Sequence, residues 1–142
     1  MFQMAAQYPP EMTEPMKAEL TRLGVESLES EEAVTTALAR PGTTLVVVNS
    51  VCGCAAGGAR PGVAKALQNA KQPDHAVTVF AGVDKPAVAA ARAAFKGYAP
   101  SSPQIALLKD GEVAFILERG HIEGRTADMI AADLSSAFDR FC

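Results

Sequence analysis

Two cysteines separated by a single glycine are the residues of this sequence best suited to chemistry. Cys52, Gly53 and Cys54 follow the β-branched run at residues 43–50, and a third cysteine, Cys142, ends the chain. Closely spaced thiols can exchange disulfides, hold a metal ion or pack as small apolar residues. A position between a strand and a helix favours redox chemistry, because the unpaired N–H groups of a helix start stabilise a thiolate.

The one-residue spacer predicts a particular kind of disulfide. A bond between Cys52 and Cys54 closes a small ring, which we expect to be strained and readily reduced. Gly53 is expected to supply the backbone angles of this ring, and the small residues 55–58 to leave room for a large partner. Arg60 either adds positive charge near the thiols or is an ordinary surface arginine.

Two other interpretations of the cysteines stay open at this point. A metal-binding or metal-delivery module could use both thiols, but zinc and iron–sulfur sites usually need four ligands. Only Cys142, His75 and His121 are available as further soft ligands, so we expect no metal. In the other interpretation the chain is a non-catalytic interaction protein whose cysteines only pack.

Composition limits the class of protein. The 142 residues suit one domain, and a net charge of −3 without any run of Lys or Arg argues against nucleic-acid binding. No apolar stretch approaches the roughly 18 residues needed to cross a membrane. The first residues lack the pattern of a secretory signal, so we expect a cytoplasmic protein.

Hydrophobic periodicity predicts the elements that position the cysteines. Strands should alternate with helices after residue 43 and then form a hairpin, which indicates an α/β fold with a central mixed sheet flanked by helices on both faces. We expect a single domain with a helical extension at about 1–42 and a core at about 43–142. The expected helices are 12–24, 30–42, 60–70, 84–97 and 125–142, and the expected strands are 43–50, 76–83, 103–110 and 112–119.

The core resembles the thioredoxin-like fold, in which a proline faces the cysteines from the start of a later strand. Here that proline is Pro103, directly before the apolar run "QIALL". The resemblance implies that the Ser102–Pro103 peptide bond is cis and that Pro103 shapes the substrate groove. Cis bonds are largely confined to proline, and they tend to be structurally meaningful.

Over nearly the whole chain the sequence is similar to the bacilliredoxin family. The matching segments are "NSVCGCAAGGARPG", "YAPSSPQIALLKDGE", "ERGHIEGR", the ending "AFDRFC" and the Tyr-Pro at residues 8–9. The one-residue spacer and the absence of tryptophan differ from ordinary thioredoxins and glutaredoxins, so strong general reductase activity is not expected.

The bacilliredoxin resemblance implies a thiol–disulfide oxidoreductase that removes bacillithiol from protein cysteines, with disulfide isomerase activity in some members. Cys52 would attack the mixed disulfide, and either Cys54 or a second bacillithiol would resolve it. Gly53, Ser102, Pro103 and Arg60 are the candidate substrate-binding residues. The partners would be bacillithiolated or disulfide-containing proteins and bacillithiol itself, with no other cofactor.

Overall fold

A five-stranded mixed sheet forms the centre of the molecule in the computed structural model, which describes residues 7–142. The strand order is β1-β3-β2-β4-β5; β3 is parallel to β1 and β2, whereas β4 is antiparallel to β2 and β5. The expected α/β mixed sheet is therefore confirmed, with the last strand antiparallel at an edge. The strands are β1 (Glu26–Ser27), β2 (Thr43–Asn49), β3 (His75–Phe80), β4 (Gln104–Lys109) and β5 (Glu112–Leu117).

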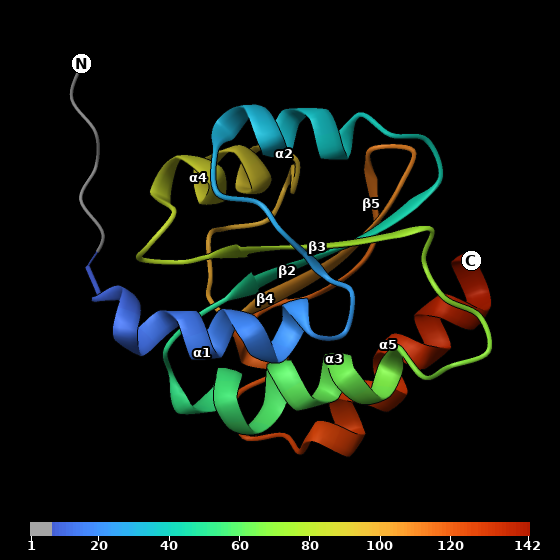
Figure 1. Cartoon of the computed structure of the whole chain (residues 1–142). Coiled ribbons are helices and arrows are strands. Elements are labelled where there is room, and N and C mark those ends of the chain that lie inside the picture. Colours follow the sequence, from blue (N-terminus) through green and yellow to red (C-terminus); the bar gives the residue numbers. More distant parts are fainter. Residues whose placement is uncertain (1–6) are drawn as a thin grey trace.

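Helices cover both faces of the sheet, as expected. In Figure 1, α2 and α4 lie on one face, and α1, α3 and α5 lie on the other. The N-terminal segment is not purely helical, because it also supplies β1, which pairs with β3. The helices are α1 (Pro10–Thr21), α2 (Glu31–Leu38), α3 (Arg60–Ala66), α4 (Lys85–Ala93) and α5 (Ala127–Phe141). A π-helical segment, η1 (Ala55–Ala59), leads directly into α3, and a short 3-10 helix, η2 (Arg119–His121), follows β5.

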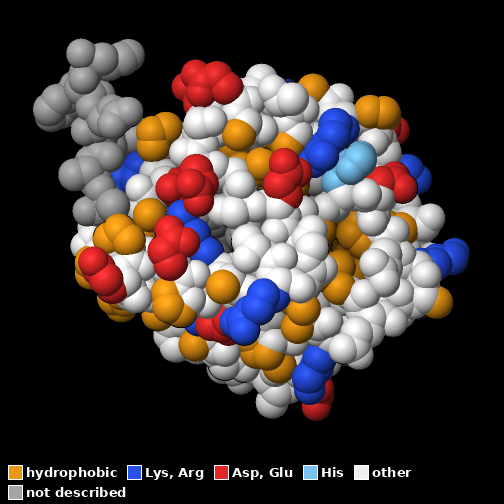
Figure 2. Space-filling view, in the orientation of Figure 1, with side chains coloured by type: hydrophobic (Ala, Val, Ile, Leu, Met, Phe, Trp, Pro, Cys, Tyr) orange, Lys and Arg blue, Asp and Glu red, His pale blue; other side chains and the backbone are white. Residues whose placement is uncertain are grey.

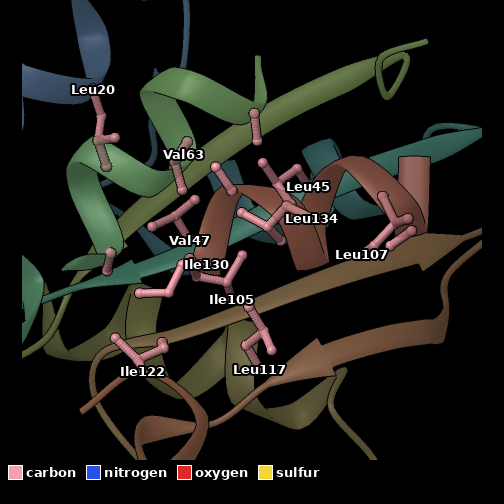
Figure 3. Packing of buried hydrophobic residues seen from close by; sticks show 14 of the residues in the cluster. Leu20, Leu45, Val47, Val63, Ile105, Leu107, Leu117, Ile122, Ile130 and Leu134 are labelled. Atoms are coloured by element: carbon pink, nitrogen blue, oxygen red, sulfur yellow. The ribbon is translucent and has the colours of Figure 1, made fainter. Parts of the chain in front are cut away.

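The central strand β2 is buried on both faces, which explains its continuous β-branched sequence. Successive side chains of a strand point to opposite faces. Leu45 and Val47 accordingly join the cluster under α3 and α5, and Val46 and Val48 join the cluster under α2 and α4. Figure 3 shows Leu45 and Val47 directed toward the side chains of the covering helices.

The small residues after the cysteines mainly serve helix packing. Helical backbone runs from residue 53 to residue 66, earlier than expected, and is π-helical in η1. A Cβ on Gly58 would lie 3.1 Å from Ile130 of α5, and one on Gly62 only 2.7 Å from the same side chain. Ala55 and Gly58 are buried and therefore serve packing, whereas Ala56 and Gly57 are exposed. That the exposed residues leave room for a partner stays a prediction.

Charged side chains of both signs are interspersed on the face seen in Figure 2. That face therefore offers no continuous basic stripe for a phosphate backbone. In the part of the chain that the structure describes, no helix has the length and apolar character needed to span a bilayer.

A buried lysine ties α1 to the other layer. Lys17 lies 2.9 Å from both Glu29 and Asp84, and its side chain is 7% exposed. Burial alone would lower the pKa of Lys17, but hydrogen bonds and charge from Asp84 and Glu29 outweigh burial and raise it. Its ion pairs therefore stabilise the fold below the ordinary lysine pKa, and this contribution disappears as pH rises through the higher folded value.

Gly62→Ala should destabilise the protein by about 1–3 kcal/mol, because its Cβ would overlap Ile130 in a packed interface. Gly57→Ala is the matched control, since a Cβ there meets nothing within 4 Å. It should be neutral or stabilising, by up to about 1 kcal/mol. Urea unfolding measures both, and an equal effect of the two substitutions would contradict the proposed packing role.

Lys17→Met should cost about 3 kcal/mol at pH 7, because it leaves the Asp84 carboxylate enclosed and unpaired. Burial raises the pKa of Asp84 and Lys17 opposes that rise, so without the lysine this carboxyl should protonate more readily. The loss should therefore shrink as the pH is lowered toward 4. Lys96→Met, at an exposed position, is the control. Urea unfolding from pH 4 to 8 tests this, and a pH-independent loss would disprove it.

Candidate active site

Loops from several strands meet at one edge of the sheet and form the candidate site. The β2 and β4 register places Val48 opposite Gln104, so the loop after β2 lies beside the loop before β4. The loop after β3 reaches the same edge, because β3 runs parallel to β2. The carboxyl ends of parallel strands are where α/β proteins usually build sites.

Cys52 and Cys54 form a disulfide in this structure. Their Cα atoms are 5.4 Å apart, within the usual range for disulfide-bonded residues. Both cysteines are half-buried and pack against the core, and the Cys52 carbonyl accepts hydrogen bonds from the N–H groups of Ala55 and Ala56. The expected place of the pair at a helix start is thus confirmed, whereas its ready reduction stays a prediction.

Gly53 does not have the expected backbone role. Its φ is not in the left-handed region occupied by six other glycines of this chain. A Cβ at this position would also meet nothing within 4 Å. The conformation between the cysteines is therefore open to other residues, and the distinctive property of Gly53 is that it is exposed and lacks a side chain.

Arg60 is a buried cation and not a surface arginine, since it is only 3% exposed. Its Nη1 donates to Asn49 Oδ1 at 2.9 Å and to the Ser50 carbonyl at 2.8 Å. Its Nε lies 3.1 Å from Glu19 Oε1, a charge contact without hydrogen-bond alignment. Arg60 thus fixes the end of β2 through its hydrogen bonds to Asn49 and Ser50.

The contacts of Arg60 continue to the cysteine backbone. Asn49 Oδ1 also accepts the Ser50 N–H at 2.9 Å, and Ser50 Oγ accepts the Cys52 N–H at 3.2 Å. Sequence reasoning missed Asn49 and Ser50 as supporting residues. Their polar character at the end of an apolar strand was the available signal, because buried polar groups require partners.

The Ser102–Pro103 peptide bond is cis, as the thioredoxin-like resemblance implied. Pro103 itself is buried, while Ser102 is half-buried and lines a cavity together with Cys52. The structure therefore places Ser102 at the cavity that Cys52 also lines, whereas direct substrate contact by Pro103 stays a prediction.

The cavity beside Cys52 has a volume of about 310 Å³. Several of the residues that line it were not identified as candidates from the sequence. Tyr8, Arg92 and Arg119 are the most notable of them. Tyr8 and Arg119 lay in segments matched to a known family, but Arg92 lies in an alanine-rich helix that carried no signal. The full lining is Gln7, Tyr8, Ser50, Val51, Cys52, Ala81, Gly82, Arg92, Ser102 and Arg119.

The other thiol and imidazole groups lie elsewhere. His75 begins β3, at the strand end opposite the site, and Cys142 is free and exposed at the chain end. His121 accepts a hydrogen bond from the Glu118 N–H through Nδ1 at 3.0 Å and borders a different cavity. Within residues 7–142, no group of three or more His, Cys, Asp or Glu is placed so that it could hold a metal ion.

Comparison with known proteins gives consistent matches. A family model described as disulphide isomerase matches residues 8–142. The bacilliredoxin of Cytophaga hutchinsonii is 54% identical over 93% of this chain and 98% of its own length. A bacilliredoxin of Koribacter versatilis is 49% identical over 95% and 94% of the two chains, and one of Bacillus cereus is 54% identical over 96% of each.

A solved structure described as having a thioredoxin fold superimposes with a TM-score of 0.58, covering 80% of this chain and 92% of that one. At 17% identity this similarity establishes the fold alone. The thioredoxin-like fold, the paired cysteines and the full-length relatives agree with one another. The chain belongs to the bacilliredoxin family and is a thiol–disulfide oxidoreductase.

Proposed function

We propose that this protein removes bacillithiol from S-bacillithiolated protein cysteines, with Cys52 as the nucleophile. The observation that carries the proposal is the position of Cys52, which lines a polar cavity while forming a disulfide with its neighbour Cys54. The names of the relatives support bacillithiol as the co-substrate. A cysteine that merely packs would not need access to such a cavity.

The first step is attack of the Cys52 thiolate on the capped protein cysteine. Its sulfur bonds to the sulfur of bacillithiol, the old sulfur–sulfur bond breaks, and the protein cysteine leaves as a thiolate that takes up a proton. N–H groups at the start of the helical segment favour the Cys52 thiolate, because they stabilise negative charge. The immediate products are a reduced client protein and a bacillithiol-capped Cys52.

The second step restores the enzyme by one of two routes. Cys54 can attack the Cys52 sulfur, which releases bacillithiol and forms the Cys52–Cys54 disulfide. Alternatively, a second bacillithiol can attack the sulfur of the bacillithiol that is bound to Cys52. This releases oxidised bacillithiol and leaves Cys52 reduced. The short Cα–Cα distance supports the internal route.

Four residues are proposed to assist substrate binding in different ways. Gly53 leaves the surface above the disulfide open for a client protein, and Ser102 borders the cavity. Pro103 shapes the groove through the backbone that precedes β4. Arg60, being buried, contributes by holding the Asn49–Ser50 backbone in place.

The cellular setting belongs to the same proposal. The partners would be bacillithiolated or disulfide-containing proteins and bacillithiol, acting in the cytoplasm as one folded unit. The family description as a disulphide isomerase supports rearrangement of protein disulfides as a second activity of the same thiols.

Cys52→Ser should reduce the release of bacillithiol from a capped protein to the uncatalysed rate, because the attacking sulfur is gone. Cys54→Ser should still perform the first step and accumulate bacillithiol on Cys52, unless free bacillithiol is added. Mass spectrometry of single-turnover mixtures distinguishes these states. Cys142→Ser is the matched control and should behave as wild type, and residual activity in Cys52→Ser would contradict the assigned roles.

Gly53→Ala should leave the free energy of unfolding within about 0.5 kcal/mol of wild type, because the position is open and needs no special φ. It should slow the removal of bacillithiol from a folded client protein several-fold, because the methyl group lies where the client approaches. Exchange with a small disulfide should change little. Gly57→Ala serves as the control, and a large loss of stability in Gly53→Ala would argue for a backbone role instead.

A further inference from the structure

The cavity beside Cys52 carries positive charge from two parts of the chain that are distant in sequence. Arg92 comes from α4, and Arg119 comes from the turn after β5. Tyr8 lines another side of this cavity and lies close to Gly82. A Cβ on Gly82 would lie only 2.8 Å from the tyrosine ring, so the absence of a side chain at Gly82 allows this close contact. The Gln7 N–H holds this segment through a 2.7 Å hydrogen bond to the Gly82 carbonyl.

Arg92 is the less neutralised of the two arginines. Its Nη2 donates to the Ser101 carbonyl at 2.9 Å, while its Nε is buried without a hydrogen-bond acceptor. Within residues 7–142, no carboxylate oxygen lies within 4.0 Å of its guanidinium. Burial lowers the pKa of Arg92, but arginine stays protonated in proteins. A half-buried cation without a counter-charge is suited to binding an anion.

Arg119 offers a second, more accessible cation. Its Nη1 donates to the Ser102 carbonyl at 3.0 Å, and its Nε pairs with Glu123 at 2.8 Å. Its side chain is 47% exposed. The two arginines thus bind successive carbonyls, those of Ser101 and Ser102, in the loop that borders Cys52.

The size and chemistry of the cavity fit a small anionic thiol. Its volume of about 310 Å³ lies at the lower end for small-molecule sites. Bacillithiol carries its cysteine on a glucosamine that is linked to malate, so it brings hydroxyl groups and a dicarboxylate. A client protein, in contrast, would approach over the exposed surface at Gly53.

We propose that this cavity is the bacillithiol subsite, in which Arg92, assisted by Arg119, binds the malate carboxylates while the thiol sulfur lies at Cys52. This inference rests on the proposed function and specifies which residues recognise the cap. In the transfer step the bacillithiol sulfur passes from the client cysteine to Cys52, with the malate end held in the cavity. In the resolving step Cys54 attacks the Cys52 sulfur, which forms the Cys52–Cys54 disulfide and releases bacillithiol as a thiolate. Alternatively, a second bacillithiol attacks the sulfur of the bound bacillithiol, which forms oxidised bacillithiol and releases Cys52 as a thiolate.

The test compares two caps on the same client protein, bacillithiol and the uncharged thiol β-mercaptoethanol. Arg92→Gln should lower kcat/KM for the bacillithiol cap by roughly 10- to 100-fold, the loss expected for one charge-assisted hydrogen bond. The rate for the uncharged cap should be essentially unchanged. Arg22→Gln, at an exposed arginine after α1, removes the same charge elsewhere and should leave both rates unchanged.

A binding measurement separates the subsite from the reaction. S-methyl bacillithiol cannot exchange disulfides, so its affinity for the full-length reduced protein, measured by calorimetry, is independent of turnover. Affinity should fall in Arg92→Gln, recover in part in Arg92→Lys, and be weak for an S-methyl cysteinyl-glucosamine that lacks malate. If wild type binds this ligand but removes no cap, the proposed reaction fails while the subsite stands.

Two results would overturn the subsite. Equal losses for both caps would mean that Arg92 only positions the Ser101–Ser102 loop, and unchanged binding of S-methyl bacillithiol would mean that the anion is held elsewhere. If Arg92→Gln does not fold, Arg119→Gln takes its place at an exposed side chain and must lower both the affinity and the bacillithiol-cap rate.

Discussion

A buried guanidinium is the constraint on which the site depends. Arg60 lies under the end of β2 and must have acceptors, because removing one partner of a buried charge pair typically costs about 3–5 kcal/mol. Asn49 Oδ1 and the Ser50 carbonyl supply these acceptors, and Glu19 on α1 supplies the countercharge. The charge of Arg60 thereby holds the backbone that leads into the cysteines, and it couples that backbone to α1, which lies on the same face of the sheet as α3.

Close packing of α5 is the second condition. Gly58 and Gly62 allow Ile130 to approach the helix that begins at the cysteines, so this helix has little freedom to shift. Its first residues nevertheless reach the surface, where Gly53 and Gly57 are exposed. One short segment thus combines a rigid inner face with an accessible outer face, which suits a thiol that must meet both a protein and a small molecule.

Much of the fold could be predicted from the sequence because its signals are local. The β-branched run at residues 43–50 indicated a strand buried on both faces, and β2 is buried throughout. The position of Pro103 before an apolar run, together with the thioredoxin-like resemblance, predicted that the Ser102–Pro103 bond is cis, and it is. β1 escaped prediction because its two residues have no periodicity, and it exists only through pairing with β3.

The sequence by itself determined the reactive pair, its place between a strand and a helix, and the family, since each depends on residue types at short spacing. Only the tertiary structure decided that Arg60 is buried, that Gly53 needs no special backbone angle, and that Arg92 lies beside Cys52. The physical reason is that periodicity reports which face of an element is apolar. Which polar side chains share a cavity depends instead on strand order and on how closely loops from distant elements approach.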